Sequence, residues 1–213
     1  KKISGCKVVY HQSDEISLVW NIECDSSAEF PFDGRFQKME SLLASYATAF
    51  FNKKLAEFLP EKEDELPTFD ARAFVVPNLM EAYHALLWRQ QDATKNAISM
   101  AAQSMFSHKQ LQKKNGAEMQ EMMWSTHGVN FNDYPAFFKR GTYVRRVKRE
   151  RVLTQAELER LPEAHRPTGP VVRSGVESMD IWLSRQPKPL DVLFFDAEPV
   201  AVAGPVAGAE EAV

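Results

Sequence analysis

The 213-residue sequence lacks several features that would place it in a familiar class. No stretch approaches the about 18 consecutive apolar residues of a membrane helix, and no signal peptide opens the chain. The two cysteines, Cys6 and Cys24, form no Cys-x-x-Cys pair, which argues against a zinc site, and they allow at most one disulfide. The net charge of −3 lacks the basic excess of a general nucleic-acid binder. We therefore expect a cytoplasmic protein with no membrane partner.

A packed core is expected from what the sequence does contain. Hydrophobic residues make up 44% of the chain and aromatic residues 11%, with 14 phenylalanines. We predict a core over residues 1–152 and a C-terminal appendage over residues 153–196. Residues 197–213 are dominated by Ala, Val, Pro, Gly and Glu and are expected to form a disordered tail.

Hydrophobic periodicity predicts an α+β fold. Residues 6–9 and 16–22 are rich in β-branched and aromatic side chains and flank a polar tip, a pattern typical of a β-hairpin. The same reasoning predicts helices over residues 36–59, 79–90, 92–106, 117–124 and 154–161, and further strands over residues 69–76, 137–152 and 176–183. This order favours a sheet with helices packed on one face.

The hairpin tip carries the first candidate for chemistry. Asp14 and Glu15 follow Ser13 at the turn. Carboxylate oxygens are the ligands that Mg²⁺ prefers, and paired metals activate nucleotidyl transfer. An acidic pair at a turn is also common where the side chains are merely solvated, so the pattern alone leaves both interpretations open.

Basic residues suggest phosphate contacts at two further places. Lys38 lies near the start of the helix over residues 36–59, where a cation does not favour the helix dipole and could instead grip a triphosphate. Lys109 belongs to a basic helix end over residues 107–114 that could meet RNA. Solvation and dipole compensation explain these positions equally well. Asp92 is expected to cap the helix over residues 92–106.

The strongest local charge lies in residues 139–151. Seven cations stand against one acid there: Lys139, Arg140, Arg145, Arg146, Lys148, Arg149 and Arg151 against Glu150. This bias suggests a phosphate-binding surface. A charged edge strand protected against aggregation would show the same composition.

Four segments in order resemble one family. They are His11-Gln12-Ser13-Asp14-Glu15-Ile16-Ser17, Phe69-Asp70-Ala71-Arg72, Leu87-Trp88-Arg89-Gln90-Gln91-Asp92, and Asn130-Phe131-Asn132 followed by Lys139-Arg140-Gly141-Thr142. Together they are similar to motifs of the tRNA-His guanylyltransferases and their bacterial guanylyltransferase-like relatives. Members add nucleotides in the 3′-to-5′ direction to the 5′ end of RNA. The resemblance covers roughly residues 3–146.

The resemblance implies a polymerase-palm-like antiparallel sheet with two Mg²⁺ ions and with GTP or ATP as substrates. By position, Asp14 would bind metal and nucleotide, Ser13 would touch the nucleotide, and Glu15 would support the catalytic site. Lys38 and Asn96 would lie near the nucleotide. The residues expected to meet RNA are Arg89, Lys109, Lys139, Arg140 and Arg145.

Two departures from the family pattern shape the expectation. Only Asn96 matches the His-Ile-Asn-Asn segment that eukaryotic members carry after the Trp-Arg-Gln motif, so the chain resembles more closely the bacterial members that repair truncated tRNA. The family's other metal carboxylate belongs to an Asp-Gly-Arg-x-Phe motif upstream of Asp14. The internal Asp33 sits in a similar motif but follows Asp14, and we interpret it as a loop residue. The palm is therefore expected to lack its N-terminal strand.

The leading hypothesis is a Mg²⁺-dependent nucleotidyltransferase that extends the 5′ end of tRNA, either by tRNA-His guanylylation or by 5′-end repair. Family resemblance also implies a homotetramer. Two alternatives remain: a non-catalytic RNA-binding relative, favoured by the basic run, and a palm-fold nucleotidyl cyclase, favoured by the acidic hairpin.

Overall fold

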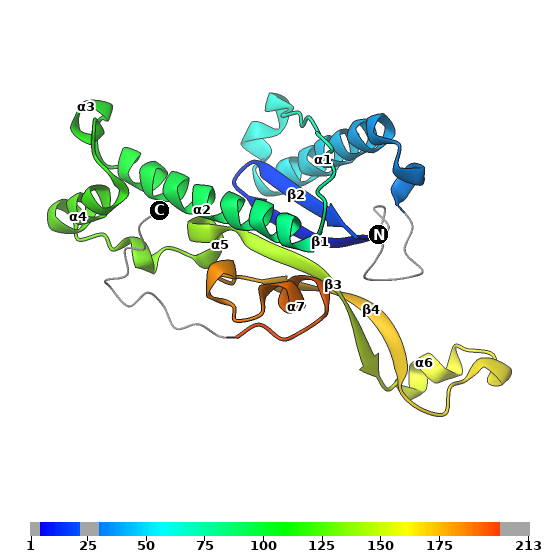
Figure 1. Cartoon of the computed structure of the whole chain (residues 1–213). Helices are drawn as coiled ribbons and strands as arrows, with labels where there is room; N and C mark the ends of the chain where they lie inside the picture. Colours follow the sequence, from blue (N-terminus) through cyan, green and yellow to red (C-terminus); the bar gives the residue numbers. More distant parts are fainter. Residues whose placement is uncertain (1–4, 22–29, 201–213) are drawn as a thin grey trace. The chain divides into compact units, whose positions relative to one another are not determined.

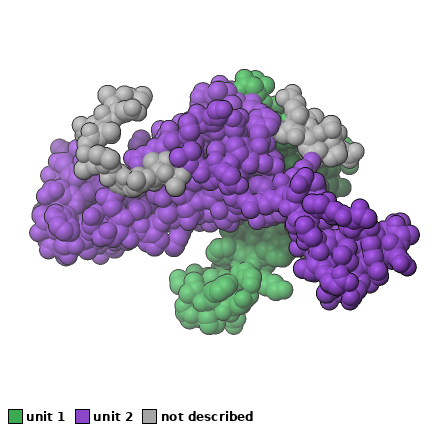
Figure 2. All heavy atoms as spheres, turned by 90° about the horizontal axis from the view of Figure 1, so that it is seen from below, with its two compact units in different colours: residues 1–5, 20–78 green, residues 6–19, 79–213 purple. Residues whose placement is uncertain are grey.

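The computed structural model describes residues 5–21 and 30–200 (Figure 1). The chain divides into two compact units, residues 1–5 with 20–78 and residues 6–19 with 79–213 (Figure 2). The predicted boundaries at residues 152 and 196 stay predictions. Cys24 and residues 201–213 of the expected tail lie outside the described part.

The second unit is built on a sheet of four strands in the order β2-β1-β3-β4. β1 (Cys6–Gln12) and β2 (Glu15–Trp20) form the predicted hairpin. β3 (Thr142–Arg151) pairs antiparallel with β1 and also with β4 (Val171–Met179). The antiparallel sheet and its helices confirm the predicted α+β class.

One face of this sheet is covered by helices. Tyr143 and Arg145 are two residues apart on β3, so their side chains point to the same face. The Tyr143 hydroxyl meets the carbonyl of Leu86 in α2 (Leu79–Gln103), and Arg145 donates to the carbonyl of Val192 in α7 (Pro189–Phe194). Tyr10 of β1 packs its ring 4.6 Å from that of Tyr143. Both helices therefore cover the face that holds the core.

β3 and β4 continue beyond β1 as a two-stranded ribbon. β1 pairs only with residues 142–145 of β3, whereas β4 pairs with residues 143–151. The ribbon carries α6 (Gln155–Glu159) and a 3-10 turn (Glu163–His165) at its end, as Figure 1 shows. A capping box of Thr154 and Glu157 begins α6. The strand predicted over residues 176–183 thus begins earlier and ends earlier than expected.

α2 corrects the prediction of two helices. Residues 79–103 form one continuous helix, and Asp92 lies in its interior, where it accepts a hydrogen bond from Asn96 at 3.2 Å rather than capping a new helix. The buried positions Ala82, Leu86, Gln90, Ala93 and Ala97 recur at helical spacing through the expected break. A continuous apolar stripe therefore outweighs the local capping preference of Asp92.

A small second cluster of apolar side chains packs at the C-terminal end of α2. Two short helices, α3 (His108–Leu111) and α4 (Gly116–His127), contribute to it. Its buried members are Ala97, Ile98, Ala101, Ala102, Phe106, Leu111, Met123 and Phe131. A 3-10 turn (Phe131–Asp133) and α5 (Ala136–Arg140) then lead back to β3. α5 occupies the start of the region predicted as a strand from residue 137.

The first unit is organised around α1 (Phe36–Phe58), which lies between 3-10 turns at Pro31–Gly34 and Pro60–Glu65. Residues 69–76 form no strand, contrary to prediction. Side chains of α1 hold this segment instead: Thr48 accepts from the Phe69 amide at 3.0 Å and Glu40 from the Ala73 amide at 2.7 Å. Hydrogen bonds to a helix thus replace the ladder that the β-rich sequence suggested.

Across the described residues no helix combines the length and apolarity needed to cross a membrane. The start of the expected tail is placed by contacts: Val200 exchanges two hydrogen bonds with the side chain of Gln186, at 2.9 and 3.1 Å.

Candidate active site at the hairpin end of the sheet

Three stretches of chain meet at one end of the sheet, which we call the hairpin end. β1 runs to Gln12 and turns at the acidic tip. β3 begins at Thr142, opposite His11, and β4 finishes at Met179, opposite Tyr143. The tip, the segment that enters β3 and the segment that leaves β4 therefore share this end.

The two neighbouring carboxylates at the tip have different surroundings. Ser13 turns the chain with a φ of 51°, and Asp14 follows with an exposed side chain. Glu15 instead forms an ion pair with Arg89 of α2. The guanidinium of Arg89 also lies 5.0 Å from the centre of the Trp88 ring. The tip is thus fixed through Glu15, while Asp14 stays open to solvent.

Gly141 lets β3 start against the base of the hairpin. Its φ of 70° and ψ of −176° fall in a region used almost only by glycine. A Cβ at this position would lie 2.5 Å from the carbonyl oxygen of His11 and 2.7 Å from the Tyr10 hydroxyl. Only glycine therefore permits this close approach to the end of β1.

Gln90 ties α2 to the other segments of the hairpin end. Its side chain is almost fully buried, with 1% of the residue exposed. The amide donates to the carbonyl of Ile181 at 2.8 Å and, more weakly, to that of Arg140 at 3.4 Å. Its oxygen accepts from the Leu183 amide at 2.8 Å. The Arg140 carbonyl also accepts from the Tyr10 hydroxyl at 2.9 Å, so one carbonyl joins β1, α2 and α5.

Lys139 and Arg140 are partly buried cations at this end. Arg140 donates to the Asp180 carbonyl at 3.2 Å and lies over the Trp182 ring at 5.2 Å. Burial lowers the pKa of both cations, and each pKa is lowered further by a neighbouring positive charge. Lys139 donates to the Asn132 carbonyl, which shows how part of the Asn-x-Asn segment is used.

The described donors are of the type that Mg²⁺ prefers but too few for a two-metal centre. Asp14 offers one exposed carboxylate, while Glu15 is engaged by Arg89. Among the residues that the structure describes, no three His, Cys, Asp or Glu side chains gather as a metal-binding group. No metal-dependent step can be derived from these residues alone.

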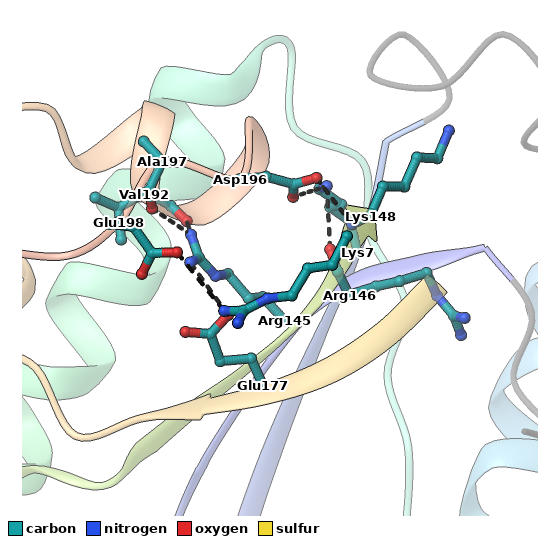
Figure 3. Close-up of polar contacts among 10 residues, drawn as sticks. Lys7, Arg145, Arg146, Lys148, Glu177, Val192, Asp196, Ala197 and Glu198 are labelled. Carbon is teal, nitrogen blue, oxygen red and sulfur yellow. Dashed lines mark hydrogen bonds and ion pairs between the residues drawn. The ribbon is translucent and has the colours of Figure 1, made fainter. Parts of the chain in front are cut away.

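Arg145 corrects one prediction, because it is not available to RNA. Its side chain is fully buried and donates to the carbonyls of Val192 and Ala197 and to Glu177 (Figure 3). Glu177 also pairs with Arg149 at 2.8 Å. Arg145 therefore fastens the chain after α7 to the sheet. Arg149 and Arg151 point to the same face of β3 as Arg145. They lie on the ribbon beyond the part of β3 that pairs with β1, and they are exposed.

The same region holds a second polar contact between distant segments (Figure 3). Lys7 of β1 pairs with Asp196 at 2.8 Å and donates to the Arg146 carbonyl at 3.2 Å. Asp196 also accepts from the Lys148 amide at 3.1 Å. Burial acts to raise the pKa of Asp196, but the two hydrogen bonds and the lysine charge outweigh it and lower that pKa. These contacts are structural rather than part of the hairpin end.

Three predicted residues are not brought to the tip by any described contact. Lys38 belongs to the first unit, where its ammonium lies 5.1 Å from the Phe32 ring centre. Asn96 hydrogen-bonds with Asp92 on α2. Lys109 is an exposed residue of α3, beyond the C-terminal end of α2. Their proposed contacts with nucleotide or RNA stay predictions.

Sequence reasoning missed Gln90, Trp182 and Arg185 as parts of this end. Gln90 carried a usable signal, since a lone glutamine interrupts an otherwise apolar stripe of α2. Trp182 and Arg185 carried none, because only the pairing of β4 with β3 brings the segment after Met179 to the hairpin end.

Comparison with known proteins identifies relatives of this chain. The family described as Thg1, tRNAHis guanylyltransferase, matches residues 1–77. A curated tRNA(His) guanylyltransferase of Saccharomyces cerevisiae is 30% identical over 152 residues, which is 65% of this chain and 62% of that protein. The Schizosaccharomyces pombe enzyme is 29% identical, and the chain spans 54% of its length.

Solved structures extend the match over nearly the whole chain. A bacterial tRNA(His) guanylyltransferase (Thg1)-like protein in complex with ATP superposes with a TM-score of 0.69 and 34% identity, covering 91% of this chain and 73% of that one. A bacterial Thg1-like protein in complex with GTP gives a TM-score of 0.60 and 32% identity, covering 86% and 67% of the two chains. With its acidic tip, its glycine-dependent entry into β3 and this breadth of similarity, the chain belongs to the tRNA-His guanylyltransferase family.

Proposed function

We propose that this protein adds nucleotides in the 3′-to-5′ direction to the 5′ end of tRNA. In this reaction the 5′ end is first activated by a nucleoside triphosphate. The 3′-hydroxyl of an incoming nucleotide then attacks the activated phosphate and displaces the activating group. The relatives named tRNA(His) guanylyltransferase support tRNA as one substrate. The bacterial relatives in complex with ATP or GTP support a nucleoside triphosphate as the other.

The observation that carries the proposal is the separation of roles at the hairpin tip. Glu15 is neutralised by Arg89, and that ion pair fixes the tip against α2. Asp14 is left with an exposed carboxylate one residue away. An exposed carboxylate at the end of a sheet is suited to bind a metal cation, which would in turn hold the phosphate groups.

Positively charged side chains near the tip could bind phosphate oxygens. Arg140 projects from the segment that Gly141 and Gln90 fix against β1, so its position is set by buried contacts. For Arg89 we propose a different role from the predicted RNA contact, because its guanidinium pairs with Glu15. We assign Arg89 to positioning the tip and Arg140 to phosphate contact.

Magnesium is part of the proposal. Asp14 would supply one ligand, and further ligands would have to come from outside the described residues, because the described ones form no cluster of three. Bound Mg²⁺ would activate the attacking hydroxyl and stabilise the leaving phosphate.

The test is an Asp14→Asn substitution in the protein as the cell makes it. With a 5′-truncated tRNA, labelled GTP and Mg²⁺, we expect incorporation to fall by at least about a hundredfold, as loss of a group that acts in the transition state does. Asp33→Asn is the control, an exposed aspartate of the first unit in the run Asp33-Gly34-Arg35, and it should retain activity. Full activity of Asp14→Asn would refute the assignment.

A non-catalytic RNA-binding relative is the second candidate, favoured by the exposed arginines of the ribbon. Arg149, Arg151, Arg160 and Arg173 line one depression there with a volume of about 610 Å³. Such a protein would bind RNA with a steep salt dependence and incorporate no nucleotide. A salt titration of binding, run beside the incorporation assay, separates the two candidates.

Assembly and location follow from the resemblance alone. We propose a homotetramer in the cytoplasm, which size-exclusion chromatography with light scattering and localisation of a tagged protein would test.

A further inference from the structure

The segment after β4 is held at the hairpin end by several hydrogen bonds. Gln90 bonds to both Ile181 and Leu183, and Leu183 is fully buried. The hydroxyl of Thr142 donates to the Asp180 carboxylate at 2.6 Å. The short 3-10 turn Leu183–Arg185 then begins directly after Trp182. Trp182 and Arg185 therefore stand on an anchored backbone.

Two arginines share the indole ring of Trp182. The guanidinium carbon of Arg140 lies 5.2 Å from the ring centre and that of Arg185 lies 5.4 Å from it. Such distances are typical of cation–π contacts, which hold a guanidinium without consuming its hydrogen-bond donors. We call Arg140, Trp182 and Arg185 the Trp182 cluster.

The cluster has an excess of positive charge and unused donors. The positive charge of Arg185 acts, together with burial, to lower the pKa of Arg140, while Asp180 acts in the opposite direction. The Asp180 carboxylate is shared with Thr142 and balances only one of the two arginines. The Nε of Arg140 is buried and has no hydrogen-bond partner within the described chain. An anion between the arginines would relieve this repulsion and accept hydrogen bonds from their outer guanidinium N–H groups.

We infer that the Trp182 cluster binds the phosphate groups of a triphosphate, carried by a free nucleotide or by the 5′ end of an RNA. The ligand class rests on the proposed function, because an enzyme that activates 5′ ends handles triphosphates in both forms. Planar guanidinium groups donate to phosphate oxygens in pairs, and two of them on one platform match a group with several charged oxygens. The residues after Met179 would thereby belong to the site rather than to an appendage.

The first experiment titrates the protein with inorganic tripolyphosphate, followed by calorimetry and by tryptophan fluorescence. Arg185→Gln should weaken binding about tenfold, since a charge-assisted contact is lost. Arg173→Gln removes the same charge from the exposed ribbon and should bind like the wild type. Trp182→Phe should lose most of the fluorescence change. Equal affinity of Arg185→Gln and wild type, or equal weakening by Arg173→Gln, would overturn the inference.

The second experiment identifies the carrier of the triphosphate. GTP, a 5′-triphosphorylated RNA and the same RNA with a 5′-hydroxyl are compared on wild type and Arg185→Gln. Weakening with GTP or with the triphosphorylated RNA alone supports the inference and names the carrier. Equal weakening with the 5′-hydroxyl RNA overturns it in favour of a general backbone contact. These are binding measurements, so they stand even if the incorporation assay shows no enzyme activity.

Discussion

Gly141 is held in a conformation that other residues rarely adopt, with φ of 70° and ψ of −176°. It also faces the His11 carbonyl at a distance that leaves no room for a Cβ. Replacement with alanine adds backbone strain of about 1–3 kcal/mol to this steric overlap. The cost falls where β3 meets the base of the acidic hairpin, so it should disturb the site as well as the fold.

We therefore predict that Gly141→Ala lowers the free energy of unfolding by about 2–4 kcal/mol, measured in urea, since strain and overlap add. Gly128→Ala is the matched control: Gly128 has a φ of 66°, but nothing lies within 4 Å of its added Cβ. It should cost only about 1–2 kcal/mol. Equal costs at the two glycines would show that the close approach to His11 is unimportant.

Arg145 was predicted to contact RNA, but in the structure it is buried, and the two roles can be distinguished by experiment. Arg145→Met should destabilise the protein by about 3–5 kcal/mol, because Glu177 and two carbonyls lose a buried partner. Arg149→Met removes an exposed cation that shares Glu177 and should cost less than about 1 kcal/mol. Denaturant unfolding measures both. A loss of RNA affinity without a loss of stability in Arg145→Met would restore the predicted RNA contact.

At the residue level the sequence identified types of side chain better than their surroundings. Asp14 and Glu15 were expected at or just after a turn; Asp14 lies in the turn and Glu15 begins β2. Their different states were not predictable, because the partner of Glu15 comes from α2, more than seventy residues later. The burial of Arg145 was hidden for the same reason: its partners come from α7 and β4.

At the level of elements, periodicity succeeded where one pattern dominated. The hairpin, α1 and α4 are close to their predicted bounds. Prediction failed at Asp92, where a good capping residue sits inside a longer apolar stripe, and at residues 69–76, where a β-rich segment lies on a helix. In both places tertiary contacts override local preference.

The short helix α6 offers a pH-dependent prediction at this scale. Glu157 accepts from the Thr154 amide, pairs with Arg151 and accepts from the Thr154 hydroxyl, and these contacts lower its pKa to about 2. A carboxylate with a depressed pKa stabilises the folded form above its unfolded pKa of about 4.3, and this contribution is lost as pH falls toward 2. We expect α6 to loosen between these values.

Carboxyl NMR shifts followed against pH would test this. Arg151→Gln should raise the pKa of Glu157 while leaving it below about 4.3, because the first of its causes, the Thr154 amide, remains. Arg160→Gln, a nearby exposed arginine, should leave that pKa unchanged. A return of Glu157 to its ordinary pKa in Arg151→Gln would show that the ion pair alone is responsible.

At the scale of the whole molecule, one end of one sheet is the proposed centre of the chemistry. The acidic tip, the start of β3 and the segment after β4 meet there, and the ribbon lies at the other end of β3. Three of the family-like segments, residues 11–17, 87–92 and 139–142, lie in this second unit although they are far apart in the sequence. The proposed nucleotide site lies in the second unit, at residues whose exchange can be measured separately from that of the ribbon.

Hydrogen–deuterium exchange of the natural protein, with and without GTP and Mg²⁺, tests that central claim most directly. We predict slower exchange in peptides covering residues 11–17 and 139–143 when GTP is bound, because ligand contacts restrict opening of the backbone there. Peptides from residues 155–175 of the ribbon should be unchanged and serve as the internal control. Protection confined to the ribbon, or none at saturating GTP, would contradict the placement of the nucleotide site at the hairpin end.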